Sequence, residues 1–192
     1  MDNKNLTKYL FENNYVVIKN FIDESRSIAI SNEFKKADRR KDAVIEKSTS
    51  LYNFMPSLEL LCEKTPIISE IVGEYVLPTY TFTRRYEKDS ELPIHKDRGS
   101  CEITLTVHLD SDGSHSWPIS IQTPSGENKS IVFSHGDAML YFGCESWHWR
   151  EKYQGTWYNQ TMLHYVRSNG SQSHRYFDKI DTIRRNRNLP RV

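Results

Sequence analysis

Residues 92–110 read LPIHKDRGSCEITLTVHLD, and this stretch carries the strongest indications of both fold and chemistry. Its two runs of β-branched and apolar residues, Leu92–Lys96 and Cys101–Leu109, predict two short strands. The first run leads into His95-Lys96-Asp97. Because residues two apart on a strand point the same way, this imidazole and this carboxylate would offer two metal ligands from one element.

The same strand-forming texture extends over most of the chain after residue 78. Turn sequences such as Asp110-Ser111-Asp112-Gly113 and Pro124-Ser125-Gly126 separate the runs. Seven short strands at this spacing predict an antiparallel sandwich or barrel. The five further predicted strands are Thr79–Tyr86, Trp117–Gln122, Lys129–Phe133, Ala138–Phe142 and Trp157–Val166.

The first third of the chain reads mainly as helix. Leu6, Tyr9 and Leu10 share one helical face, and Tyr15–Ile18 is a short β-prone run. Further helices are predicted to begin at Asp23, at Ser57 and at Thr65-Pro66, with Asp23 and Ser57 as N-caps and Pro66 at a first helical position.

These patterns divide a single domain into three parts. Residues 1–78 are predicted to form a helical cover, residues 79–167 the β core, and residues 168–192 a polar tail. The charge-rich stretch Lys35–Lys47 is predicted to be solvated, and residues 35–53 as a whole stay open as a lid, a disordered loop or a dimer contact.

The composition excludes several classes of protein. The 192 residues suit one domain, and 26 Lys and Arg against 25 Asp and Glu give a net charge of only +1. No apolar run reaches the roughly 18–20 residues of a membrane span, and Met1–Asn5 opens no signal segment. Nucleic acid is not an expected partner, because the C-terminal arginines lack interleaved aromatic residues and are predicted to be a solvated end: Arg184, Arg185, Arg187 and Arg191.

The cysteines indicate a reducing environment. Cys62, Cys101 and Cys144 are odd in number, far apart and without a CxxC pair. A disulfide framework or a thiolate zinc site is therefore not expected. Cytoplasmic localisation is expected instead.

Three His-x-Asp patterns occur, although seven histidines and 25 acids in 192 residues predict about one by chance. His135-Gly136-Asp137 lies in a predicted turn, where glycine breaks the same-face geometry. His108-Leu109-Asp110 ends a strand, and its best partner would be His164, after which no strand remains to close a sheet around a site. Neither pattern is assigned a function.

The remaining pattern, His95-x-Asp97, has a predicted strand on each side. It pairs with His148, 53 residues further along, which is followed by one last strand. Two imidazoles and one carboxylate form a facial triad, which leaves positions on Fe(II) open for an oxidant and a cosubstrate. We therefore predict that His95, Asp97 and His148 are metal ligands and catalytic residues.

With this triad and strand order, the sequence resembles Fe(II)/2-oxoglutarate-dependent dioxygenases of the prolyl-hydroxylase-like and phytanoyl type. The resemblance spans about Tyr15–Val166 and rests on residues 92–110, WPI at 117–119, GDAMLYFGCESWHWREKYQGTWYNQTMLHYV at 136–166 and NNYVVIKNFID at 13–23. It implies a double-stranded β-helix, the cupin-like jelly roll, behind N-terminal helices. It also implies Fe(II), 2-oxoglutarate and O2 as cofactor and cosubstrates, and hydroxylation of a small molecule, amino acid or peptide with release of succinate and CO2.

One feature departs from that family. A basic residue about nine to eleven positions after the second histidine usually binds the distal carboxylate of 2-oxoglutarate, whereas Trp157–Asn159 stand here. Arg150 is the first alternative, since on an extended chain it shares a side with His148 and a guanidinium suits a carboxylate. The other predicted cosubstrate-binding residues are Arg98, Arg84, Tyr86 and Gln160.

Two alternatives stay open at this stage. The missing late basic residue allows a cupin-like metalloenzyme that does not use 2-oxoglutarate, and the strands alone allow a non-catalytic β-sandwich binding module. Oligomeric state and substrate identity are not predicted. Aromatic residues near the motifs are expected to wall a substrate pocket: Tyr80, Phe82, Tyr86, Trp117, Tyr141, Trp147, Trp149 and Trp157.

Overall fold

A computed structural model describes residues 3–178 of the chain, so the four C-terminal arginines singled out above lie outside the described residues. The helices are α1 (Asn3–Asn13), α2 (Glu24–Lys36) and α3 (Met55–Val72), with short 3-10 turns η1 (Gly99–Cys101) and η2 (Ser173–Arg175). The strands are β1 (Tyr15–Ile18), β2 (Arg40–Lys41), β3 (Ser48–Tyr52), β4 (Val76–Glu87), β5 (Leu92–His95), β6 (Ile103–Ser111), β7 (Ile119–Gln122), β8 (Asn128–Ile131), β9 (Ala138–Phe142), β10 (His148–Arg150) and β11 (Trp157–Arg167).

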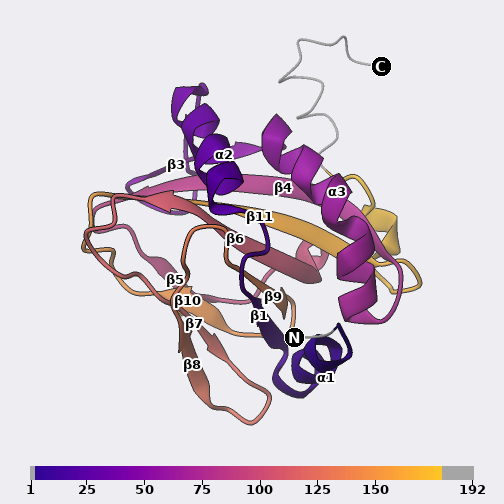
Figure 1. The fold of residues 1–192 in the computed structure, drawn as a ribbon. Coiled ribbons are helices and arrows are strands. Elements are labelled where there is room, and N and C mark those ends of the chain that lie inside the picture. Colours follow the sequence, from indigo (N-terminus) through magenta and orange to yellow (C-terminus); the bar gives the residue numbers. More distant parts are fainter. Residues whose placement is uncertain (1–2, 179–192) are drawn as a thin grey trace.

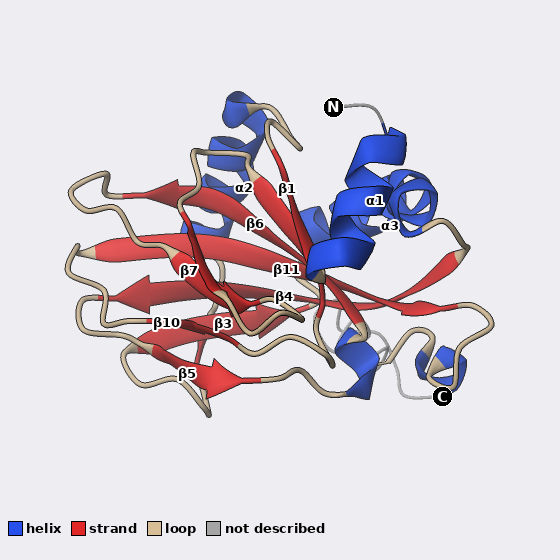
Figure 2. Ribbon diagram, turned by 90° about the horizontal axis from the view of Figure 1, so that it is seen from below, coloured by secondary structure: helices blue, strands red, loops and turns tan. Residues whose placement is uncertain are grey.

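Two antiparallel sheets form the core. The larger has the order β1-β9-β6-β11-β4-β3-β2 and the smaller the order β5-β10-β7-β8. In Figure 1 the helices α2 and α3 lie over the long strands of the larger sheet, and Figure 2 shows β5, β7 and β10 across that sheet's other face. This arrangement confirms the predicted jelly roll with N-terminal helices.

The larger sheet turns its apolar side toward the helices. Along β6, Ile103, Leu105 and Val107 are fully buried in one cluster with apolar residues of all three helices. Burial of each such side chain contributes roughly 1.5–3 kcal/mol. The alternate residues Thr104 and Thr106 therefore face the space between the two sheets, which gives this β sandwich a partly polar interior.

Two smaller apolar clusters close the space between the sheets. One includes Ile119 and Tyr141, and the other includes Tyr86 and Leu92. All four side chains also line the cavity described below, so the cavity borders both clusters.

The prediction of two helices starting at Ser57 and Pro66 is wrong, because α3 runs through Pro66 without a break. A proline inside a helix costs about 3 kcal/mol. Leu61, Ile68 and Val72, on both sides of the proline, are buried against the core, and their burial offsets that cost. Asp23 occupies the N-cap position of α2 as predicted, but its side chain makes no capping hydrogen bond.

The segment from residue 35 to 53 is ordered and forms two further strands, β2 and β3, at the edge of the larger sheet. Ser48 and Ser50 are buried there although the strand lacks the apolar alternation that identifies strands from sequence. The three-part division of the chain stays a prediction, but its first part is not purely helical, since β1, β2 and β3 all join the large sheet. None of the helices between residues 3 and 178 has the length and apolar content needed to cross a membrane.

Candidate metal centre and cavity

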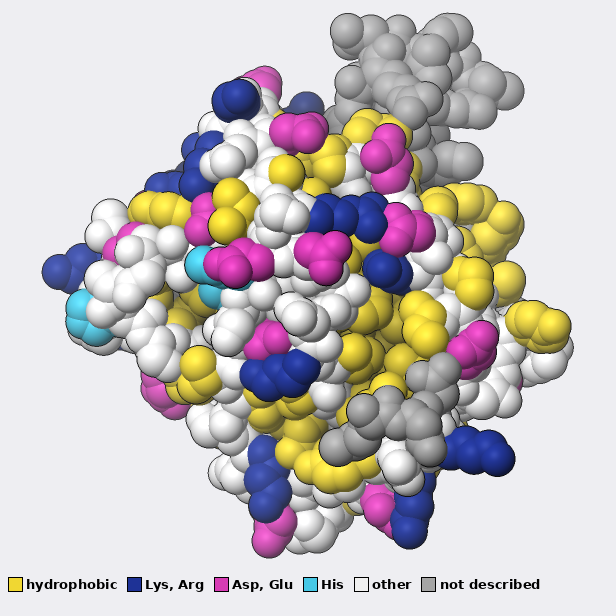
Figure 3. All heavy atoms as spheres, viewed as in Figure 1, with side chains coloured by type: hydrophobic (Ala, Val, Ile, Leu, Met, Phe, Trp, Pro, Cys, Tyr) yellow, Lys and Arg dark blue, Asp and Glu magenta, His cyan; other side chains and the backbone are white. Residues whose placement is uncertain are grey.

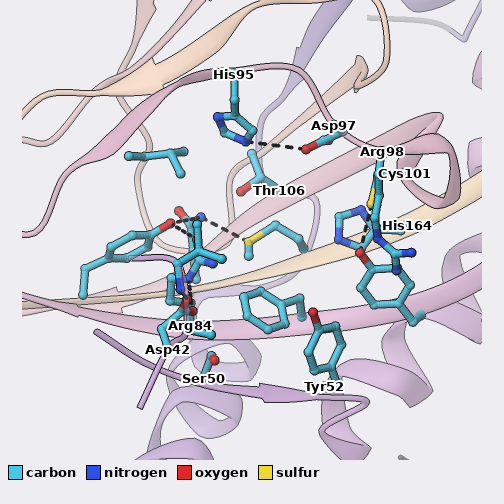
Figure 4. Close-up of a pocket in the computed structure, with 18 of the residues that line it drawn as sticks. Asp42, Ser50, Tyr52, Arg84, His95, Asp97, Arg98, Cys101, Thr106 and His164 are labelled. Atoms are coloured by element: carbon cyan, nitrogen blue, oxygen red, sulfur yellow. Dashed lines mark hydrogen bonds and ion pairs between the residues drawn. The ribbon is translucent and has the colours of Figure 1, made fainter. Parts of the chain in front are cut away.

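A cavity of about 560 Å³ opens between the two sheets. Side chains of β3, β4, β6 and β11 line it on the side of the larger sheet, and His95 and His148 line it on the side of the smaller sheet. In Figure 4, Thr106 lies between the His95–Asp97 pair and the Arg84–Asp42 pair. The volume is within the range of small-molecule sites, roughly 300–1,000 Å³.

Strand pairing brings the two histidines together. His95 ends β5, His148 begins β10, and the two residues are direct partners in the antiparallel ladder. Their ring centroids are 4.2 Å apart. Asp97 follows β5, and its backbone N–H donates to the Gly143 carbonyl at 2.9 Å. A Cβ at residue 143 would collide with the Asp97 carboxylate and the Cys101 carbonyl, so glycine permits this close approach.

The backbone sets the tautomer of both rings. His95 Nδ1 lies 2.8 Å from the Pro93 carbonyl and His148 Nδ1 lies 3.0 Å from the Ser146 carbonyl. Because carbonyls only accept hydrogen bonds, both Nδ1 atoms carry a proton, and the neutral form of each ring therefore has its lone pair on Nε2. Metal-ligating histidines are held in the same way.

The two Nε2 atoms converge on one carboxylate oxygen, Asp97 Oδ1, at 3.7 Å each. The Tyr141 hydroxyl is 3.4 Å from His148 Nε2, a long contact for a hydroxyl donor. Two atoms held about 2.0–2.2 Å from one ion lie no more than about 4.4 Å apart, so these separations fit a shared cation. Three electron-pair donors that face one another are better satisfied by a cation than by one another.

Burial favours the ligating form of His148. Its side chain is almost fully enclosed, and burial lowers the pKa of His148, although the nearby Asp97 charge acts in the opposite direction. A neutral imidazole is the form that binds a metal.

Thr104 on β6 fixes the orientation of Asp97. Its hydroxyl donates to Asp97 Oδ2 at 2.8 Å and lies 3.1 Å from His164 Nδ1. Since the single hydroxyl proton goes to the carboxylate, His164 Nδ1–H donates to the Thr104 oxygen. Burial lowers the pKa of His164 to about 4, so this ring is neutral near pH 7. Asp97 Oδ1 is thereby left to face the two histidines.

Thr104→Val should weaken Mn(II) binding about tenfold, because loss of a positioning hydrogen bond to a ligand carboxylate typically has an effect of this order. The unfolding free energy should fall by roughly 1–3 kcal/mol as well, since His164 Nδ1–H loses its acceptor. Calorimetric Mn(II) titration of folded protein measures the first effect. Thr104→Ser, which keeps the hydroxyl, serves as the control, and equal affinity in the valine and serine variants would contradict the positioning role.

A second group of potential ligands shares the same carboxylate. Asp97, Cys101 and His164 also have ligand atoms within 4.8 Å of one another. The Cys101 thiol is 3.0 Å from the Tyr80 hydroxyl, and burial raises the pKa of Cys101, which disfavours the thiolate that a metal requires. His164 Nδ1 is already engaged by Thr104. The His95, Asp97 and His148 group is therefore the better donor set.

The candidate anchors for 2-oxoglutarate separate into two environments. Arg84 and Arg98 line the cavity, whereas Arg150 does not. Arg150 is buried among Trp117 and Tyr158, and its guanidinium donates to the Trp117 carbonyl and, at 3.0 Å, to Gln160. It thus packs inside the core, away from the cavity, although sequence reasoning placed it first.

Arg84 on β4 is 9% exposed and points into the cavity. Its Nε donates to Asp42 Oδ2 at 2.8 Å and its Nη1 to the Tyr86 hydroxyl at 3.0 Å. Burial alone would raise the pKa of Asp42, but the Arg84 charge and the backbone N–H groups of Val44 and Ile45 bring the pKa of Asp42 below its usual value. Arg84 and Asp42 therefore form a buried ion pair.

Gln160 and Tyr86, the predicted neutral partners, lie beside Arg84. Gln160 Nε2 donates to the Tyr86 hydroxyl at 3.3 Å, and both side chains line the cavity. Arg98 lies at the mouth, is exposed, and pairs with Asp178 at 3.0 Å.

Sequence reasoning missed Thr106, whose buried hydroxyl belongs to the wall of the cavity. Its side chain is 1% exposed, lines the cavity, and its hydroxyl has no hydrogen-bond partner within residues 3–178. A buried hydroxyl without a partner is unfavourable unless a ligand or water completes it. The alternation of β6 is the only sequence feature that could have placed Thr106 on the inner face.

The expected aromatic wall is only half present. Tyr80, Phe82, Tyr86 and Tyr141 line the cavity, and the four tryptophans at 117, 147, 149 and 157 do not. Trp117 instead packs in the core beside Arg150, and Trp157 lies under Lys35 and Arg85. Trp147 is 43% exposed.

Comparison with known proteins gives results at two levels. No family model matches the sequence, and no curated protein matches it. Solved structures, however, share its fold over most of the chain. A prolyl-4-hydroxylase from Pseudomonas putida superposes with a TM-score of 0.71 at 11% identity, covering 86% of this chain and 99% of that one.

Two further structures extend this likeness. An oxidoreductase of the 2OG-Fe(II) oxygenase family from Burkholderia pseudomallei has a TM-score of 0.74 at 13% identity and covers 92% of this chain and 95% of its own. HygX from Streptomyces hygroscopicus, solved with nickel and 2-oxoglutarate bound, has a TM-score of 0.74 at 11% identity and covers 88% and 89%. At these identities the likeness establishes the double-stranded β-helix fold.

Proposed function

We propose that this chain is an Fe(II)- and 2-oxoglutarate-dependent oxygenase that hydroxylates a small molecule, amino acid or peptide. The observation that carries the proposal is the convergence of two imidazole Nε2 atoms and one carboxylate oxygen at the wall of a cavity. That donor set suits a non-haem Fe(II) site with open positions. The shared fold with a prolyl-4-hydroxylase and with the nickel- and 2-oxoglutarate-bound HygX supports it.

Each residue has a distinct task in this proposal. His95, Asp97 and His148 hold the metal, and Thr104 keeps Asp97 in its orientation. Bound Fe(II) and 2-oxoglutarate would supply the oxidation, in which O2 converts the keto acid to succinate and CO2 and an oxygen atom is delivered to the substrate. Tyr80 and Phe82 exclude water from the cavity wall beside the substrate.

We assign the distal carboxylate of 2-oxoglutarate to Arg84. This guanidinium is the only cation within the described cavity lining that is itself buried, and charge-assisted hydrogen bonds are strongest away from water. The hydroxyls of Tyr86 and Thr106 are neutral partners for the same anion, and Gln160 supports Tyr86. Arg150, the first choice from sequence, instead donates a hydrogen bond to Gln160 from inside the core.

Turnover with Fe(II) and 2-oxoglutarate tests the proposal. The purified protein should release succinate from 2-oxoglutarate in an oxygen-dependent manner, slowly without substrate and faster with one. Mn(II) titration followed by 2-oxoglutarate titration tests binding separately from turnover. Mn(II) binding without 2-oxoglutarate binding would favour the cupin-like alternative, which the absence of a basic residue at 157–159 motivates. Indifference to metal would favour the binding module.

Thr106→Val should have opposite effects on stability and on ligand binding. Removing a buried hydroxyl that has no partner should leave the unfolding free energy unchanged or raise it. The same change should weaken 2-oxoglutarate binding about five- to tenfold, the worth of one neutral hydrogen bond. Chemical denaturation and 2-oxoglutarate titration of the Mn(II) form measure the two effects, and a stability loss without an affinity loss would contradict a ligand-facing hydroxyl.

The reducing cytoplasm expected from the sequence remains part of the proposal. All three cysteines are free, as that compartment favours.

A further inference from the structure

The cavity has room for more than the proposed cosubstrate. At no more than about 30 Å³ for each non-hydrogen atom, the share of one molecule in liquid water, 2-oxoglutarate with its roughly ten such atoms would take at most about 300 Å³. The cavity holds about 560 Å³. If the proposed function is right, the remaining space belongs to the substrate, and its lining describes that substrate.

The lining carries more positive than negative charge. Five cationic and two acidic residues line the cavity, but the Lys96 ammonium lies over the Trp147 ring, outside the lining, and Arg98 pairs with Asp178. Fe(II) and the 2-oxoglutarate dianion would cancel each other, so Arg40 and Lys41 would remain the unpaired cations of the described lining. Both carboxylates already have a partner in this proposal: Asp42 pairs with Arg84, and Asp97 belongs to the metal site. The five cations are Arg40, Lys41, Arg84, Lys96 and Arg98.

Four of these cations are exposed and come from two segments of the chain. Arg40 and Lys41 form β2 at the edge of the larger sheet, while Lys96 and Arg98 flank Asp97 after β5 of the smaller sheet. Within residues 3–178, Arg40, Lys41 and Lys96 have no carboxylate at ion-pair distance. On the face seen in Figure 3, by contrast, acidic and basic side chains are interspersed. Of these four, Arg40 and Lys41 thus offer an anion two adjacent, unpaired positive charges on β2.

An apolar wall lies beside these cations. The ring of Tyr52 on β3 packs against Phe82 and Tyr80, with centroids 4.6 Å and 5.4 Å away. Tyr52 is 38% exposed, and all three rings line the cavity. A flat or ringed apolar group would bury area here while a charged group reached the mouth.

We propose that the substrate is an anionic small molecule with an apolar body. Its body packs on the Tyr52 and Phe82 rings, and its carboxylate or phosphate faces Arg40 and Lys41 at the mouth. Cations gathered around a cleft with low-dielectric walls raise the local concentration of anions and speed their entry, and the effect weakens with salt. Solvated surface lysines spread over the molecule would give no such preference.

Matched aromatic probes test this inference on protein loaded with Mn(II) and 2-oxoglutarate. The probes are phenylpropanoate, phenethyl phosphate, phenylpropanamide and phenylpropylamine, and paramagnetic broadening of their proton resonances by Mn(II) reports binding inside the cavity. The carboxylate or the phosphate should bind at least about tenfold more tightly than the amide, and the amine most weakly, at low salt. The better of the two anions identifies the acidic group of the substrate.

Charge variants supply the control. Arg40→Gln/Lys41→Gln should reduce the anion preference to less than about threefold, and Lys8→Gln/Lys129→Gln, which removes the same charge outside the cavity lining, should retain it. Failure of both anions to outbind the amide and amine overturns the inference, as does a preference that survives in the Arg40/Lys41 variant. Failure to bind Mn(II) and 2-oxoglutarate at all contradicts the proposed function instead.

Discussion

Asp97→Asn is expected to lower the affinity for Mn(II) by at least a hundredfold and to abolish succinate release. The substitution preserves shape, and the amide oxygen still accepts from Thr104, so the fold should persist. What is lost is the only carboxylate of the donor set, and a neutral amide binds a divalent cation far more weakly. Loss of an outer-shell partner already reduces metal affinity by about 10–100-fold, so loss of a ligand should exceed this.

His135→Ala provides the control for this prediction. His135 belongs to the same kind of His-x-Asp sequence pattern, but its ring lies beside Glu24 and Asp110, outside the cavity. Metal affinity should match that of the unaltered protein. Calorimetric Mn(II) titration and thermal unfolding of both variants measure metal affinity and stability. If His135→Ala loses the metal while Asp97→Asn keeps it, the metal site lies at the other His-x-Asp pattern.

The fold was largely predictable because its strands carry clear local signals. The Ala138–Phe142 prediction coincides with β9, and Trp157–Val166 differs from β11 by one residue. Both are rich in apolar, aromatic and β-branched residues. β3 was missed because Ser-Thr-Ser-Leu-Tyr shows no apolar alternation, and its burial comes from its neighbour β4. Tertiary pairing, not local preference, makes it a strand.

The candidate metal site was predictable for a similar reason, whereas the candidate anchor was not. His95 and Asp97 are close in sequence, and His148 was chosen because one last predicted strand follows it, whereas the ladder pairing of His95 with His148 is seen only in the structure. Arg84 and Arg150 both sit on strands and both carry the right charge. Only the three-dimensional packing separates them, because Arg150 is enclosed by aromatic rings and Arg84 reaches the cavity.

Arg84→Gln is accordingly expected to weaken 2-oxoglutarate binding by about a hundredfold while Mn(II) affinity is unchanged. Truncating one partner of a buried, hydrogen-bonded charge pair costs about 2–5 kcal/mol, and about 2.7 kcal/mol corresponds to a hundredfold. The single substitution would also leave the buried Asp42 carboxylate without its cation. Asp42→Asn/Arg84→Gln removes both charges together, and we expect it to recover stability but not 2-oxoglutarate affinity.

Arg150→Gln distinguishes this assignment from its rival. Arg150 holds the Trp117 carbonyl and Gln160 inside the core, so its loss should lower the unfolding free energy with only a small effect on 2-oxoglutarate affinity per folded molecule. Titration of 2-oxoglutarate into the Mn(II) form, paired with chemical denaturation, separates the two quantities. The opposite result would be a hundredfold affinity loss in the Arg150 variant together with near-normal affinity in the Asp42/Arg84 double variant. That result would assign the anchor to Arg150, because a cation outside the cavity lining would then be reaching the ligand through a rearranged Gln160.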